Sequence, residues 1–211
     1  MVAQSYNGRS ILRGHMEVHT YLGAEIGAFI EPLGRYRIEI FREFPYLYDG
    51  DMEYERTYLS RYLKSEEGFL LLGQDASGIA CACTGIPLEH EMDEFKAPFT
   101  QHGSSVTDKF YLGEIMIRKD LRGQGLGTRV MKLALGAIAR TAKYQHAVLC
   151  TVIRPPNHPL KPADYKFNDN LWRNSGFSKL ADYKVLFPWK DLGDARETMK
   201  PMNYWIKSLG V

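Results

Sequence analysis

The chain has 211 residues, 45% of them hydrophobic and 25% charged, and its formal net charge at pH 7 is +2. This length suits one domain, and the hydrophobic content is enough for a sizeable core. The small net charge removes any compositional argument for a nucleic acid or another polyanion as partner. We therefore expect a single domain over residues 16–211.

The first fifteen residues are polar and hold no apolar run long enough for a signal peptide. We interpret residues 1–15 as a flexible leader or a cloning remnant, because Gly14-His15-Met16 looks like a cloning junction. No segment approaches the roughly 20 apolar residues that a membrane span needs. A membrane partner is therefore not expected.

The three cysteines, Cys81, Cys83 and Cys150, all lie inside apolar segments. An odd number in such positions is typical of reduced core residues and not of a disulfide framework. Cys81 and Cys83 would share one face of a strand, but the chain has no second pair to complete a zinc site. We expect a cytoplasmic protein without a metal.

Hydrophobic periodicity in the first half of the chain predicts a strand, helices and a hairpin. Residues 17–22 alternate as a strand, and a helical stretch over 24–44 must break or restart at Pro32. A loop at 45–51 leads into a helix over 52–64. Two apolar strands, 68–73 and 79–87, are joined by a turn-forming segment and predict a hairpin. The polar segment 89–105 is expected to be a loop with one helical turn.

The second half predicts alternating strands and helices. A nearly continuous apolar run at 110–117 indicates a strand covered on both faces. A helix over 128–144, a strand over 147–153 and a short helix over 168–175 follow, the last closed by Gly176. Four prolines make 154–165 a rigid loop, and 181–189 and 201–209 are two closing strands.

The loop at 45–51 is a candidate acceptor site. Tyr46, Tyr48 and Asp49 lie here among further carboxylates and aromatic rings, a mixture that attracts a cationic amine. The alternative is a solvated acidic turn with tyrosines packed sideways.

The proline-rich loop leaves the end of a buried strand, which is where ligands of open α/β sheets tend to bind. His158 and Tyr165 are therefore candidate site residues. The alternative is that their side chains only pack against neighbouring residues.

Gly123, Gly125 and Gly127 stand between the strand at 110–117 and the helix that follows it. Glycine allows a sharp turn and a close approach of ligand to backbone. The first-turn amides and the dipole of the helix favour a bound anion, most naturally a pyrophosphate. A surface turn before an ordinary helix is the alternative.

The spacing separates three kinds of phosphate-binding loop. A P-loop needs Lys and Ser/Thr after its last glycine, whereas Thr128 and Arg129 follow Gly127. A dinucleotide-binding loop needs G-x-G-x-x-G and an acidic residue about twenty positions on, and the strand at 147–153 carries none. The third pattern is (Gln/Arg)-x-x-Gly-x-(Gly/Ala), preceded five residues earlier by an aliphatic residue. Ile117, Arg122, Gly125 and Gly127 match it.

That pattern resembles the acetyl-CoA loop of the GNAT superfamily of N-acetyltransferases. The order of elements from residue 110 to 177 agrees with it, and segments 41–50 and 187–193 resemble an uncharacterised bacterial branch. The resemblance implies an α/β fold with a mixed central sheet flanked by helices, and acetyl-CoA as co-substrate. It also implies pyrophosphate contacts from Arg122, Gly123, Gln124, Gly125, Leu126, Gly127 and Thr128, pantetheine contacts from the backbone of Met116 and Ile117, and a contact from Asn168 or Asn170.

Glu114 is the candidate general base. It is the only charged residue in the apolar run 110–117, where a carboxylate is costly to bury unless it faces a polar cleft. The resemblance implies the same role, because a glutamate three residues before the position of Ile117 often serves as base. The alternative is a carboxylate bonded to a neighbouring Arg or Tyr.

The general acid is less clear from the sequence. Trp172 occupies the position at which many family members carry the tyrosine that protonates the thiolate, and an indole N–H cannot give up its proton at neutral pH. Tyr165 or Tyr183 would then serve, or the thiolate leaves without help from the protein.

The leading hypothesis is transfer of an acetyl group to an amine of a small molecule or peptide, by direct attack in a ternary complex. A non-catalytic acyl-CoA-binding module is the alternative, and a nucleotide-binding regulatory domain is a third interpretation. We expect a small-molecule amine as partner and no nucleic acid. A homodimer is left open.

Overall fold

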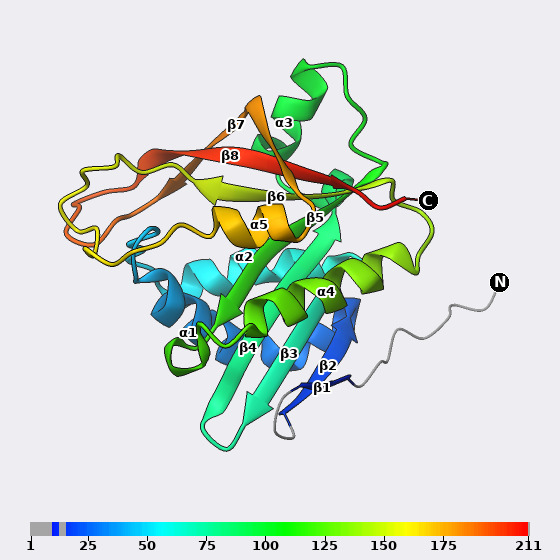
Figure 1. Ribbon diagram of the computed structural model, residues 1–211, viewed down its shortest axis with the longest axis horizontal. Coiled ribbons are helices and arrows are strands. Elements are labelled where there is room, and N and C mark those ends of the chain that lie inside the picture. Colours follow the sequence, from blue (N-terminus) through cyan, green and yellow to red (C-terminus); the bar gives the residue numbers. More distant parts are fainter. Residues whose placement is uncertain (1–9, 13–15, 211) are drawn as a thin grey trace.

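The computed structural model describes residues 10–12 and 16–210 (Figure 1). Its eight strands form one sheet in the order β1-β2-β3-β4-β5-β6-β8-β7. They are β1 (Ser10–Leu12), β2 (Met16–Leu22), β3 (Phe69–Asp75), β4 (Gly78–Pro87), β5 (Lys109–Ile117), β6 (His146–Val152), β7 (Ser178–Trp189) and β8 (Thr198–Ser208). Every predicted strand from residue 17 onward is present, and the mixed α/β fold is confirmed.

Most of the expected leader, residues 1–9 and 13–15, lies outside the described residues. Within it, Ser10–Leu12 forms β1 and pairs antiparallel with β2.

The described helices are α1 (Ile30–Phe41), α2 (Met52–Lys64), α3 (Asp93–Gln101), α4 (Leu126–Ala139) and α5 (Asp169–Asn174). Pro32 lies in the first turn of α1, after a 3-10 helix at Gly23–Phe29. A helix starting near the proline was one of the two predicted outcomes, and proline is tolerated there because first-turn amides lack helical partners. Within the described chain, no helix is both long enough and apolar enough to cross a bilayer.

Two helix predictions were wrong in extent. The polar segment at 89–105 holds the nine-residue helix α3, whose Phe95 and Phe99 are buried one turn apart. Its flanking polar residues and Pro98 hid this short apolar stripe. Helix α4 ends at Ala139, five residues before the prediction, and Ala142 has a positive φ of 52° that no helix allows.

Helices cover both faces of the sheet. Buried residues of α1, α2 and α3 pack with one face, and buried residues of α4 and α5 pack with the other. Figure 1 shows α4 and α5 in front of the strands in that view, with α1 and α2 on the opposite side.

The sheet opens at its centre. Strands β5 and β6 are parallel, and their register runs only from Lys109↔His146 to Leu112↔Leu149. Strand β5 continues to Ile117 and β6 to Val152 without pairing to each other. The strands therefore separate after Leu112, which leaves backbone groups of both strands available at the middle of the sheet.

Candidate active site

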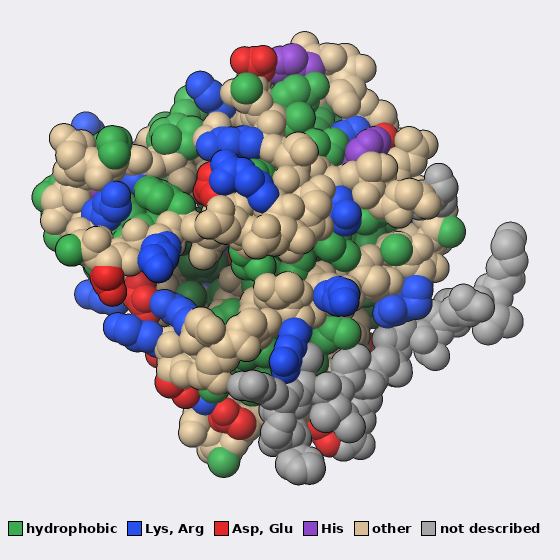
Figure 2. Space-filling view, in the orientation of Figure 1, with side chains coloured by type: hydrophobic (Ala, Val, Ile, Leu, Met, Phe, Trp, Pro, Cys, Tyr) green, Lys and Arg blue, Asp and Glu red, His purple; other side chains and the backbone are tan. Residues whose placement is uncertain are grey.

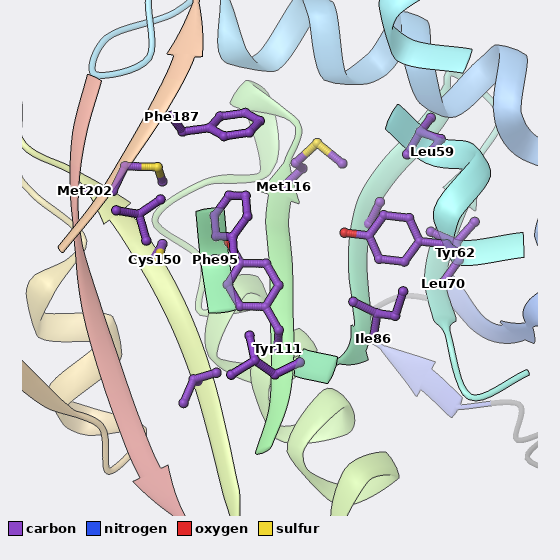
Figure 3. Packing of buried hydrophobic residues seen from close by; sticks show 14 of the residues in the cluster. Leu59, Tyr62, Leu70, Ile86, Phe95, Tyr111, Met116, Cys150, Phe187 and Met202 are labelled. Atoms are coloured by element: carbon purple, nitrogen blue, oxygen red, sulfur yellow. The ribbon is translucent and has the colours of Figure 1, made fainter. Parts of the chain in front are cut away.

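A pocket of about 540 Å³, including its open mouth, lies beside this separation. One wall comes from α1, α2 and the loop between them, and the other from α3, β5, β7 and β8. Figure 3 shows four residues of the second wall, Phe95, Tyr111, Phe187 and Met202, gathered near β5. The pocket thus joins segments that lie more than 150 residues apart in the chain, from Arg37 to Met202.

A β-bulge directs Glu114 into this pocket. Thr84 of β4 is opposite Glu114 and Gly85 is opposite Leu112, so Gly113 has no counterpart. Because one extra residue reverses the alternation of side chains, Glu114 lies on the same face as Tyr111. Both line the pocket, whereas Leu112 packs in the core of the other face. Gly113 must be glycine, since a Cβ there would collide with the hydroxyl of Tyr62.

The Glu114 carboxylate is buried and bonded on both oxygens. Arg37 of α1 and the hydroxyl of Tyr58 donate to Oε1, the latter at 2.8 Å, and Thr84 donates to Oε2. The bonds to Arg37 and Tyr58 are those of the alternative that the sequence left open, a carboxylate bonded to a neighbouring Arg or Tyr. The role of Glu114 as general base remains a prediction.

Arg37 holds a second carboxylate in the same cluster. Its Nε lies 2.5 Å from Oε2 of Glu55, which is fully buried on α2. A buried guanidinium between two carboxylates is compensated from both sides, which an isolated buried charge is not. Burial and the charge of Glu55 together raise the pKa of Tyr48, whose hydroxyl lies next to that carboxylate.

Tyr58 lies between two guanidinium groups. Cζ of Arg37 is 4.1 Å and Cζ of Arg61 is 3.6 Å from the centre of its ring. Arg61 in turn pairs at 3.2 Å with the buried Glu91, whose pKa is raised by burial, against the opposing effect of Arg61. The three ion pairs of Arg37 and Arg61 and the ring between them form one buried polar cluster beside the pocket.

The loop before α2 is fixed to the closing strands. Arg154 donates to the carbonyls of Pro45 and Tyr46 at 2.7 and 2.6 Å and pairs with both oxygens of Asp191. The indole of Trp189 also donates to the Tyr46 carbonyl at 3.0 Å, and Tyr48 forms a β-bridge with Asp191. These contacts place the rings of Tyr46 and Tyr48 in the pocket wall.

Three predicted site residues lie outside that wall. Asp49 pairs with Lys190 at 2.8 Å, so its carboxylate is already neutralised by a neighbour. His158 and Tyr165 pack on the ring of Phe44, at 5.6 and 4.7 Å between ring centroids. Burial raises the pKa of Tyr165 to about 12, which makes it a weak acid. The contacts of His158 and Tyr165 agree with the packing alternative, and the predicted roles of all three residues remain predictions.

The glycine loop has the geometry of an anion site. Gly123 and Gly125 have φ of 72° and 77°, and no described atom lies within 4 Å of a Cβ built at either position. Helix α4 begins directly after Gly125, and no described side chain caps it. Its first-turn amides, from Leu126, Gly127 and Thr128, are therefore left for a ligand. Figure 2 shows a hollow bordered by Lys and Arg side chains between α5 and the start of α4.

Two side chains of the glycine loop, Arg122 and Gln124, are bonded to other parts of the protein. Arg122 donates to the Ile117 carbonyl at 2.9 Å and pairs with Glu43 at 2.6 Å, and Gln124 donates to the Asp120 carbonyl. The bonds to Ile117 and Asp120 join the loop to its own flank, and the pair with Glu43 joins it to the segment after α1, so the backbone amides are the groups of the loop left for an anion. The predicted side-chain contacts of Arg122 and Gln124 remain predictions.

The two residues predicted to contact the pantetheine arm, Met116 and Ile117, differ in where their backbone amides point. The Arg118 amide donates to Ala80 of β4 at 2.9 Å. Since backbone groups alternate between the two edges of a strand, the Ile117 amide points toward the opening beside β6 and the Met116 amide toward β4. Ile117 is therefore placed to bond a ligand and Met116 is not. Asn170 is exposed on α5, and Trp172 is buried beneath it with an indole N–H that bonds to no described group.

Arg37, Tyr58 and Trp189 are the site residues that sequence reasoning missed. Arg37 stands between Leu33 and Phe41 at four-residue spacing, on the predicted apolar face of its helix. A charged residue on such a face is the same signal that identified Glu114. Tyr58 and Trp189 offered no such signal, because aromatic residues on apolar faces usually belong to the core. Among the described residues, no group of three or more His, Cys, Asp or Glu is arranged to hold a metal ion.

Comparison with known families decides what kind of site this is. Residues 35–162, more than half of the chain, match the model of the Acetyltransferase (GNAT) family. The chain belongs to the GNAT acetyltransferase family. The match includes the second half of α1, all of α2, β5 and the glycine loop. GNAT membership supports an acyltransferase, with acetyl-CoA as the co-substrate that suits the loop.

Solved structures share the GNAT fold over almost the whole chain. The aminoglycoside acetyltransferase AAC(6')-Ib with coenzyme A and kanamycin is 12% identical, with a TM-score of 0.58 over 90% of this chain and 94% of that one. The Salmonella typhimurium protein yncA, solved with acetyl-CoA, is 11% identical, with a TM-score of 0.57 over 93% and 95%. Ribosomal-protein-alanine N-acetyltransferase from Brucella melitensis is 12% identical, with a TM-score of 0.56 over 90% and 98%. At these identities the likeness concerns the fold. No curated protein sequence matches the chain.

Proposed function

We propose that this protein is an N-acetyltransferase that moves the acetyl group of acetyl-CoA directly to the amine of a small molecule. The position of Glu114 carries the proposal. Its carboxylate lines the aromatic pocket two residues beyond Leu112, the last residue at which β5 pairs with β6. A proton acceptor thus lies where the acceptor pocket meets the opening of the sheet.

Acetyl-CoA supplies an acetyl group activated as a thioester. The uncapped first turn of α4 and the open space at Gly123 and Gly125 fit its pyrophosphate. The Ile117 amide, unpaired by β6, fits the polar groups of its pantetheine arm. Both features are backbone groups, and they remain available although the side chains of Arg122 and Gln124 are bonded within the loop.

The acceptor amine must reach its neutral form. A lysine-like amine has a pKa near 10.4, so at pH 7.4 only about one molecule in a thousand is neutral. Glu114 receives the proton directly or through a water molecule. Burial of the amine among aromatic rings contributes to the driving force by disfavouring the ammonium.

The test is steady-state release of CoA with a panel of primary amines, for the wild type and for Glu114→Gln. We expect turnover by the wild type and a large loss in the variant with unchanged binding of acetyl-CoA by calorimetry. Equal turnover by both proteins would remove Glu114 from the mechanism.

A non-catalytic acyl-CoA-binding module is the second candidate. It is favoured by Trp172, which stands where a tyrosine is usual and is 8% exposed in the core beneath α5. Tight binding of acetyl-CoA without turnover of any amine would support this reading.

A further inference from the structure

The lining of the pocket points to the chemistry of the acceptor. Nine of its thirteen residues are aromatic, and Arg37 and Glu114 are the charged residues among those that line it. These two bond to each other. The pocket therefore offers aromatic rings, the hydroxyls of five tyrosines and a single carboxylate that is already paired, which is a poor lining for a molecule with many charges.

Three of the carboxylates that the sequence offered to a cation are engaged elsewhere. Asp49 pairs with Lys190, and Asp51 accepts from the amides of Glu53 and Tyr54 as the N-cap of α2. Glu55 is fully buried against Arg37. A polyamine or an aminoglycoside entering this pocket would have its cations desolvated, and the only carboxylate among the residues that line the pocket is Glu114, which is already paired.

The rings of the lining contact one another in series. Phe41 and Tyr46 are 4.6 Å apart between ring centroids, and Tyr46 continues to Trp189 at 6.1 Å. Tyr48 and Tyr54 form a second pair at 6.2 Å. The Tyr58 ring is already covered by Arg37 and Arg61, so it offers its hydroxyl and not its faces.

We infer that the acceptor is a monoamine carried on a flat aromatic body, an arylalkylamine. The body packs among the rings of the loop and of β7, where offset and edge-to-face contacts favour another ring. The amine lies toward Glu114, at the opening of the sheet. This inference rests on the proposed function for its chemistry, but its claim about binding can be tested without turnover.

The first experiment measures binding by quenching of tryptophan fluorescence, because Trp189 lines the pocket. The probes are 2-phenylethylamine, tryptamine, propylamine, spermidine and kanamycin, each titrated into the protein with and without CoA, with calorimetry as an independent readout. We expect the two aryl amines to bind about ten- to a hundredfold more tightly than propylamine. Tighter binding of spermidine or kanamycin, or equal binding of all amines, overturns the inference.

The second experiment compares Phe187→Leu with Leu186→Ala. Phe187 lines the pocket, whereas its neighbour Leu186 is 55% exposed on the same strand. Leucine keeps the volume approximately and removes the ring. We expect Phe187→Leu to weaken 2-phenylethylamine about tenfold and propylamine hardly at all, and Leu186→Ala to change neither. Equal loss for both amines in Phe187→Leu contradicts the inference.

The two proposals fail in different ways. Selective binding of aryl amines with no release of CoA would contradict the proposed acetyl transfer but support the inferred class of ligand. Turnover with a clear preference for a polycation would support acetyl transfer but contradict the inferred class of ligand.

Discussion

Arg37 of α1 and Glu114 of β5 form a buried ion pair in the floor of the pocket, and Glu55 closes the other side of the guanidinium. The pair joins the helical wall of the pocket to the central strand. Together with the hydroxyls of Tyr58 and Thr84, the pair holds the Glu114 carboxylate in one orientation.

Glu114→Gln is expected to lower kcat by about 10²–10⁴-fold, the range usual for loss of a general base. The fold should survive, because Glu55 still neutralises Arg37 and an amide keeps one acceptor oxygen. The measurement is kcat for 2-phenylethylamine, with circular dichroism and acetyl-CoA affinity as controls. A variant that binds acetyl-CoA more weakly would indicate a structural role instead.

Gly125→Ala is expected to weaken acetyl-CoA binding. The residue has a φ of 77°, where any side chain costs about 1–2 kcal/mol, and it precedes the first amide of α4. Gly193→Ala is the matched control, with a φ of 86°, equal open space and a position on the loop between β7 and β8. Calorimetry should show at least a tenfold loss of acetyl-CoA affinity for the first variant and none for the second. Equal affinities would remove the loop from the cofactor site.

Gly113→Ala is expected to destabilise the protein by about 1–3 kcal/mol, the usual cost of overpacking a core. The new Cβ meets the Tyr62 hydroxyl and lies 2.8 Å from Oγ1 of Thr84. The double variant Gly113→Ala, Tyr62→Phe should recover part of the loss, because it removes the nearer of the two atoms. Urea unfolding of the wild type, the two single variants and the double variant measures the coupling. Strictly additive effects would contradict the contact.

Asp191→Asn is expected to lower the free energy of unfolding by about 3 kcal/mol at pH 7, because it leaves Arg154 and Lys200 facing a neutral group. Burial raises the pKa of Asp191, but Arg154 and Lys200 outweigh it and hold the pKa below its ordinary value. Its contribution is therefore fully present above about pH 4, the ordinary range of Asp, and is lost as the pH falls through the lower folded value.

The pH series provides the check on that prediction. Unfolding in urea at pH 7 and pH 3 should show a difference between wild type and Asp191→Asn that shrinks at the lower pH. A constant difference would mean that the Asp191 carboxylate titrates alike in both states. Since Arg154 also holds the Tyr46 carbonyl, we expect Asp191→Asn to raise KM for the amine more than for acetyl-CoA.

The sequence by itself determined most of the local elements and was enough to predict the anion-binding loop. The order strand, glycine turn, helix depends on period, turn chemistry and helix termini, which are local properties that neighbouring residues express on their own. The same local reasoning identified Glu114, because one carboxylate in an apolar strand is visible without a fold.

Only the tertiary structure decided what surrounds these elements. The bulge at Gly113, which turns Glu114 toward Tyr111, depends on pairing with β4. Whether Asp49 receives a substrate or a lysine depends on Lys190, 141 positions further along the chain. Such choices depend on contacts between distant segments, and the energy of a charge depends on its partners and burial, which a linear pattern does not contain.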